Sequence, residues 1–147
     1  MICSILILVA CPLDAQVSYE IESDELEVFN QEGRAEFMGN VKIWNDTNEI
    51  HANRVEVFFE EGGDSIQIIK AFGDVEIYRE NMFASSEFAL HDVQSDTVML
   101  QENAYVQRDQ NEFWADRMWL DLTTERVRMK DNVRGHMIQT SRDRENR

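Results

Sequence analysis

The sequence is poor in the residues that form covalent cross-links, metal centres and cation-rich surfaces. Among 147 residues there are two cysteines, one proline, three histidines and 14 lysines and arginines, against 29 aspartates and glutamates. Both cysteines, Cys3 and Cys11, lie near the start of the chain, so the rest can hold neither a disulfide framework nor a reactive thiol. The formal net charge of −15 argues against nucleic acid as a partner, because binding a polyanion requires patches of lysine and arginine.

The remaining polar residues show no pattern typical of a catalytic or metal site. His51, His91 and His136 lie far apart and lack the neighbouring ligands of a zinc site. The acidic loops lack the ordering of alternating aspartates that specifies calcium. Nearly every carboxylate alternates with an apolar residue, which places it on the solvent face of a strand rather than in a cleft. We therefore expect no enzymatic activity, no metal and no cofactor.

The first residues are a different kind of segment. Residues 2–13 are almost continuously apolar but too short to span a bilayer as a helix, which takes about 20 residues. The run has the length of a signal-peptide core, with cleavage expected after Ala15. Alternatively, Leu8-Val9-Ala10-Cys11 resembles a lipobox, in which case the leader ends before Cys11 and this cysteine carries the lipid anchor. A buried core strand is the third interpretation. The first two predict export to the periplasm.

The length of the chain leaves room for one domain with a substantial core. We divide the sequence into a signal peptide at 1–15, a single folded domain at 17–135 and a polar, mobile tail at 136–147.

From Tyr19 onward the dominant signal is a period of two. Apolar and charged residues alternate in short segments such as Leu26 to Val28 and Val41 to Ile43, and clusters of Asn, Asp and Gly separate the segments. No window favours a long amphipathic helix. The pattern predicts an all-β protein made of antiparallel strands, each with one apolar face and one charged face.

Two short patterns recur in register about every thirty residues, which is typical of a repeat architecture. The first is a strand opening that occurs as SDELEV from Ser23, ANRVEV from Ala52, SSEFAL from Ser85 and ADRMWL from Ala115. The second follows each of these, as Gly39-Asn40-Val41, Gly73-Asp74-Val75, Glu102-Asn103-Ala104 and Asp131-Asn132-Val133. We infer about four stacked units, each of which buries its apolar face against its neighbours.

The repeated phrases resemble the OstA-like domain of the LptA family of periplasmic lipopolysaccharide-transport proteins. The segments that carry the resemblance are Phe37–Phe59, Ile68–Leu90 and Phe113–Gly135. The resemblance implies a twisted, partly open β-jelly roll of stacked antiparallel strands, with an apolar interior that holds the acyl chains of lipopolysaccharide. It also implies open ends that join other transport proteins, or further copies, head to tail. Membrane-anchored LptC-like relatives share this fold, and the sequence does not choose between the two.

The apolar alternation and the resemblance together define a candidate groove and candidate edges. The groove residues are Val28, Phe37, Ile43, Val57, Ile68, Ile77, Phe88, Leu90, Leu100, Val106 and Phe113. The edge-strand contacts are Leu26, Val127, Met129 and Val133. We predict that the groove binds lipid A acyl chains at about 0.8 kcal/mol per buried methylene.

Four large side chains, Phe58, Met99, Trp114 and Trp119, fall on the face opposite the predicted groove. A bulge between the tryptophans would turn them inward, whereas a contiguous patch would form a protein or membrane contact. Two other functions stay open at this point: a self-assembling β-solenoid scaffold without a lipid ligand, and a periplasmic carbohydrate-binding β-sandwich. Their apolar residues would simply pack as a closed core.

Overall fold

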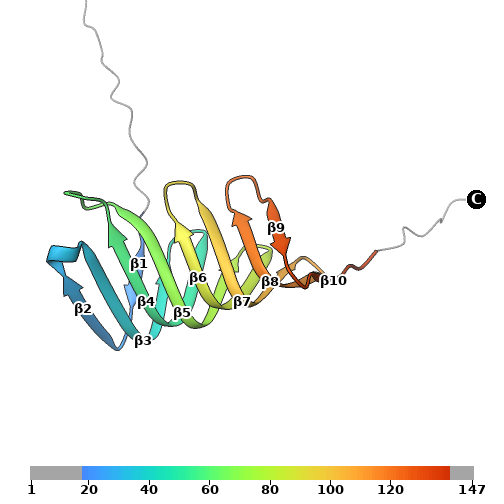
Figure 1. Ribbon diagram of the computed structural model, residues 1–147, viewed down its shortest axis with the longest axis horizontal. Coiled ribbons are helices and arrows are strands. Elements are labelled where there is room, and N and C mark those ends of the chain that lie inside the picture. The colour runs from blue at the N-terminus through green and yellow to red at the C-terminus, as the bar shows by residue number, and fades with distance from the viewer. Residues whose placement is uncertain (1–17, 140–147) are drawn as a thin grey trace, which may run out of the picture.

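The computed structural model describes residues 18–139, which form one antiparallel sheet (Figure 1). Its order is β1-β3-β4-β5-β6-β7-β8-β10, with β2 also paired to β3 and β9 to β8. The strands are β1 Glu20–Glu22, β2 Glu25–Phe29, β3 Arg34–Trp44, β4 Asn48–Phe59, β5 Ile66–Arg79, β6 Met82–Asp92, β7 Thr97–Arg108, β8 Asn111–Asp121, β9 Val127–Lys130 and β10 Arg134–His136. A short 3-10 turn, Asn30–Glu32, joins β2 to β3.

The sheet folds into two walls because every long strand bends near its middle (Figure 1). Register shifts mark the bend in each pairing from β3 through β8. The first wall contains β2, 34–38, 54–59, 66–72, 88–92, 97–101, 117–121 and β9. The second wall contains β1, 41–44, 48–51, 75–79, 82–85, 104–108, 111–115 and β10. We call the line of bends the corner.

The two sequence patterns meet at the corner. Gly39 and Asn40 both adopt positive φ angles, 78° and 45°, so β3 turns sharply and keeps its alternation. Asp24 covers this turn: its backbone N–H donates to Gly39 O at 2.9 Å, and its carboxylate accepts from Asn40 Nδ2 at 2.9 Å. Asp116 covers the turn at Asn132 in the same way, with an Oδ2 to Nδ2 distance of 2.8 Å. The contact repeats because the strands stack.

The alternation of the two sequence patterns along successive strands accounts for the number of repeats. Since β1 with β2, and β9 with β10, each cross the corner once, they behave as two further bent strands. Strands that run from the second wall to the first carry the first sequence pattern, with Asp24, Asn53, Ser86 or Asp116 at the corner. Strands that run back from the first wall to the second carry the second pattern, whose two residues at the corner have positive φ. One outward and one returning strand make one unit, and there are four such units.

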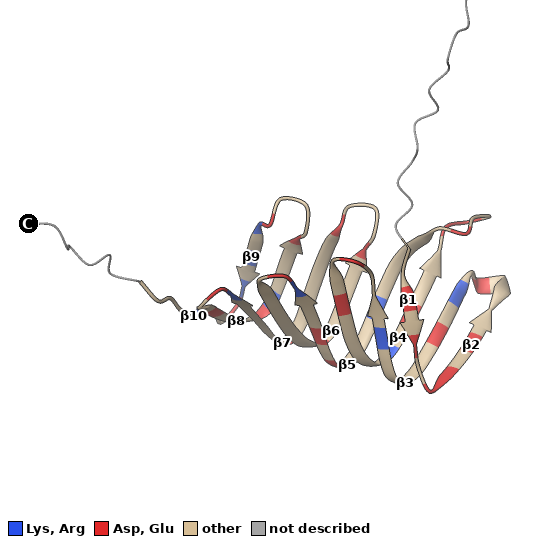
Figure 2. Ribbon diagram, turned by 180° about the vertical axis from the view of Figure 1, so that it is seen from behind, with Lys and Arg blue, Asp and Glu red and all other residues tan. Residues whose placement is uncertain are grey.

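The space between the walls is filled by apolar side chains. Val55, Val75, Leu100 and Met118 have no exposed surface, and they come from both walls. Acidic residues are prominent on β1 and β2 (Figure 2). The prediction of an all-β, partly open jelly roll built from about four repeats is confirmed.

The proposed leader at 1–15 lies outside the described residues, as does most of the tail. His136, placed at the start of the tail, is the last residue of β10 and pairs with Glu112. Within residues 18–139 there is no helix long and apolar enough to cross a membrane.

The corner contact predicts a specific sensitivity at Gly73. This residue has φ +76°, and an added Cβ would lie 2.6 Å from Asn53 Nδ2. Gly62 is the matched control, because it has φ +69° but nothing within 4 Å of an added Cβ. We expect Gly62→Ala to lower the free energy of unfolding by about 1 kcal/mol for the left-handed backbone alone. Gly73→Ala should cost at least about 1 kcal/mol more because of the added clash. Urea unfolding measures both, and equal losses would contradict the role of the contact.

Candidate functional site

Most of the predicted groove residues lie on the interior face. Five of them are buried in the core: Ile43, Val57, Ile77, Leu100 and Val106. Phe37 and Phe113 pack against the core, and Val28 stands opposite the buried Ala35. Leu26 and Val28 on β2 continue this face to the first edge, where they are 57% and 55% exposed. Val127 and Met129 on β9 continue it at the other edge, opposite Leu120 and Met118. Lipid binding at these residues stays a prediction.

Three predicted groove residues lie on the outer face instead. Phe59 pairs with Ile66 and Phe58 pairs with Ile68, so Gln67 is an extra residue that has no partner on β4. This bulge reverses the alternation, and Ile68 therefore points outward. Phe88 and Leu90 point outward because β6 loses its alternation at the corner. Buried positions are even-numbered up to Ser86 and odd-numbered from Ala89. A strict period of two does not anticipate these bulges.

The four large side chains expected on the opposite face do lie there. Trp114 stands on the outer face of the second wall, its ring centroid 5.4 Å from that of Tyr105. Trp119 stands on the outer face of the first wall, under the guanidinium of Arg128 at 4.5 Å. The bend between them changes walls without turning either ring inward, so the two tryptophans do not form one patch.

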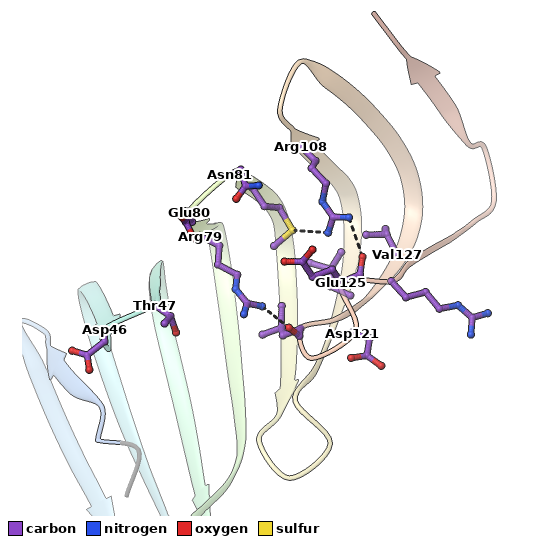
Figure 3. A pocket seen from close by; sticks show the side chains of 13 residues that line it. Asp46, Thr47, Arg79, Glu80, Asn81, Arg108, Asp121, Glu125 and Val127 are labelled. Atoms are coloured by element: carbon purple, nitrogen blue, oxygen red, sulfur yellow. Dashed lines mark hydrogen bonds between the residues drawn. The ribbon is translucent and has the colours of Figure 1, made fainter. Parts of the chain in front are cut away.

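A recess of about 430 Å³ opens between the far edges of the two walls (Figure 3). We call it the mouth. Its apolar lining consists of Met82 from the second wall and Leu120, Leu122 and Val127 from the first. Its polar lining consists of Asp46, Thr47, Arg79, Glu80, Asn81, Arg108, Asp121, Glu125 and Arg126. The mouth is therefore amphipathic, with apolar residues continuous with the core and charged residues around them.

Two arginines of the second wall hold the loop between β8 and β9 across the mouth. Arg79 Nη1 donates to Leu122 O at 3.0 Å, and Arg108 Nη1 donates to Glu125 O at 2.9 Å (Figure 3). Leu122 N–H in turn donates to Asp96 O at 2.9 Å on the first wall. Hydrogen bonds alone therefore close the seam here, whereas a continuous strand joins the walls at the corner.

His91 is buried on the interior face of the first wall, 5% exposed, beneath this loop. Its Nε2 lies 3.1 Å from Asp96 Oδ1, and its buried Nδ1 has no hydrogen-bond partner within the described residues. Burial lowers the pKa of His91, although hydrogen bonding to Asp96 and the charges of Asp96 and Asp92 act in the opposite direction. The charge of Arg79 adds to the lowering. His91 is thus held neutral in the folded protein.

Sequence reasoning missed the residues of the mouth. A signal was present, because Arg79 follows Val75 and Ile77, and Arg108 follows Ala104 and Val106, at the spacing of the interior face. An arginine at an interior position is worth notice, since charged side chains rarely face a core. No group of three or more potential metal ligands occurs within residues 18–139.

The bent, open-ended sheet with its apolar interior places the chain among β-jelly-roll proteins. The chain matches the model of the family described as LptA/(LptD N-terminal domain) LPS transport protein over residues 20–126. It belongs to this family of lipopolysaccharide-transport proteins. The resemblance stated from the sequence is confirmed.

Two relatives place this membership in context. The structure is similar to that of LptH, the LptA-homologous periplasmic component of the lipopolysaccharide transport device of Pseudomonas aeruginosa, with a TM-score of 0.77. The two share 14% identity, and the match covers 83% of this chain and 96% of LptH. An uncharacterized protein of Rhizobium meliloti (strain 1021) is 43% identical over 47 residues, which are 32% of this chain and 25% of that protein. The chain thus spans only a quarter of that relative's length in the match.

The buried histidine predicts a pH-dependent stability. Because the folded state favours neutral His91, the unfolded chain binds the proton more tightly. The free energy of unfolding should therefore fall as the pH drops through the ordinary histidine range near about 6.5. In His91→Gln this decrease between about pH 7.5 and 5.5 should become smaller. The exposed His136→Gln change is the control and should preserve the wild-type slope. Urea titrations across this pH range measure the free energy of unfolding. The same dependence on pH in wild type and His91→Gln would contradict the role of His91.

Proposed function

We propose that the chain carries lipopolysaccharide by holding its lipid A acyl chains between the two walls and passing them toward the outer membrane. The observation that supports this is the continuity of the apolar interior with uncovered apolar side chains. These are Leu26 and Val28 at the first edge, which are exposed, whereas Met82, Leu120 and Leu122 at the mouth are buried beneath the recess that they line. Each methylene that enters gains about 0.8 kcal/mol, without any direction-dependent bond that would resist sliding.

The middle of the interior is packed by the protein's own side chains, so acyl chains enter where packing ends. The mouth is the entrance that we favour, because the loop there is tied to the second wall by the bonds from Arg79 and Arg108 rather than by a continuous strand. Spreading the walls there exposes Leu120 and Met82, which are buried at present. We place the protein in the periplasm, on the basis of its apolar leader and its family. Anchoring through Cys11 stays a prediction.

Photo-crosslinking in cells tests the location of the lipid with closely matched positions. Phe37 and Phe113 pack against the core from the interior face, whereas Phe72 and Phe88 face outward and stack on one another at 5.2 Å. A photoreactive phenylalanine at Phe37 or Phe113 should capture lipopolysaccharide, and the same residue at Phe72 or Phe88 should capture at least about ten-fold less. Each change replaces phenylalanine by a close analogue, so folding is preserved.

The result also separates the alternative functions. Capture only from Phe72 or Phe88 would favour a carbohydrate-binding outer face, and no capture at all would favour a scaffold without a lipid ligand. Either outcome would contradict the interior site.

We further propose that copies, or related transport proteins, join end to end through the edges of the walls. On the first wall, β2 presents Glu25 and Glu27 outward with its apolar residues inward, and β9 presents Arg128 and Lys130 in the same arrangement. In an end-to-end stack these edges meet antiparallel. Acidic and basic side chains then face one another, and the apolar face continues without a break.

The second wall and the corner support the same arrangement. Its first edge, β1, carries Glu20 and Glu22, and its last edge, β10, carries Arg134 and His136. At the corner, the first position of the stack is occupied by a covering residue, Asp24, and the last by a positive-φ pair, Asp131 and Asn132. A second copy therefore continues the alternation of corner types across the junction.

Charge reversal tests this assembly. Arg128→Glu with Lys130→Glu should weaken self-association roughly ten-fold, as should Glu25→Lys with Glu27→Lys, because like charges then face one another. Combining all four changes should restore association. Glu61→Lys with Asp64→Lys, in the turn between β4 and β5, is the control for net charge. Sedimentation at increasing concentrations measures the effect. Association that follows net charge alone, with no restoration in the fourfold variant, would argue against edge pairing.

A further inference from the structure

Two strands of the second wall, β5 and β7, each end in an arginine at an interior-face position. Arg79 follows Ile77 on β5, and Arg108 follows Val106 on β7. Both pair in register with Met82, whose side chain is buried, so the two side chains flank Met82 on the interior face. The chain has a formal net charge of −15 and few cations to place. Two inward-facing guanidiniums at one site therefore require a physical reason, since an unpaired charge facing a core costs free energy.

Neither guanidinium is neutralised within residues 18–139. Each donates to one backbone carbonyl of the β8–β9 loop, and Arg108 also lies 4.0 Å from the sulfur of Met82. In the described part of the chain, no carboxylate oxygen lies within 4.0 Å of either arginine. Of the acids lining the mouth, Asp121 accepts instead from the backbone N–H groups of Thr123 and Thr124 at 3.0 Å. A guanidinium has five donors, so most of those at the mouth remain free for a ligand.

The surroundings of the two arginines match an amphiphile. Leu120 and Leu122 from the first wall belong to the apolar lining of the recess. Asn48 pairs in register with Arg79, and its side-chain oxygen is buried without a hydrogen-bond partner in the described chain. Asn48 is not part of the lining of the recess, which itself offers cationic donors and an apolar floor.

We infer that Arg79 and Arg108 bind the phosphate groups of the lipid headgroup, while the acyl chains pass over Met82 into the interior. This inference rests on the proposed function and adds an orientation to it, with the headgroup at the mouth and the chains inside. Guanidinium forks fit phosphate oxygens in a bidentate manner, and the bonds are charge-assisted. The phosphate replaces the carbonyls of Leu122 and Glu125, so binding releases the loop that closes the mouth.

The test compares two ligands and two pairs of substitutions. Binding of detergent-solubilised bis-phosphorylated lipid A and of the same lipid without its phosphates is measured on the full chain. We expect the wild-type protein to prefer the phosphorylated lipid by about ten-fold or more, since bonds to charged groups contribute about 1.5–3 kcal/mol. Arg79→Gln with Arg108→Gln should abolish this preference. Arg34→Gln with Lys70→Gln, on the outer face of the first wall, carries the same change in charge and should keep it.

The ratio between the two lipids separates headgroup recognition from loosening of the loop, which would affect both lipids alike. Equal binding of both lipids by the wild type would overturn the phosphate site and leave the interior site standing. A preference that survives in Arg79→Gln with Arg108→Gln would also overturn it. Failure to bind either lipid would overturn the proposed function as well. Inorganic phosphate is the remaining probe, and if it bound as tightly as the phosphorylated lipid, the site would belong to a small anion rather than to a headgroup.

Discussion

The structure depends on the contact at the corner, where a short polar side chain covers a pair of residues with positive φ. At Gly39 and Gly73 the covering residues, Asp24 and Asn53, approach so closely that no Cβ fits without a shift. Because this contact recurs along the stack, every strand bends at the same level and one sheet becomes two facing walls. The bend creates an interior, since a flat sheet of the same strands would leave its apolar face in water.

The interior is held more firmly at the corner than at the mouth. Continuous strands cross the corner, whereas the far edges of the walls are joined by hydrogen bonds from Arg79 and Arg108 to backbone carbonyls. These side-chain bonds lie where the interior meets water, so we expect the mouth to be the side at which the roll opens most easily. An opening on one side suits a carrier, because a long acyl chain can enter sideways without threading through an end.

The charges of the molecule are arranged so that they leave the interior neutral. In the end-to-end stack that we propose, acids on β1 and β2 face the arginines and lysine of β9 and β10, and burial lowers the pKa of His91, which disfavours its charged form. The two cations that do face inward stand where the interior meets water. An amphipathic ligand is recognised best at such a boundary, because its apolar part is desolvated while its charged part keeps strong partners.

The sequence by itself determined the strand pattern, the four repeats and the family, because a period of two and a repeat of fixed length are local properties. It also placed residues such as Ile77 and Val106 on the interior face. Only the tertiary structure decided the orientation of Ile68, Phe88 and Leu90, since bulges and the corner reverse the alternation. Only the tertiary structure assembled the mouth as well. Arg79 and Leu122 are 43 residues apart and meet because the sheet bends and brings the far edges of its walls together.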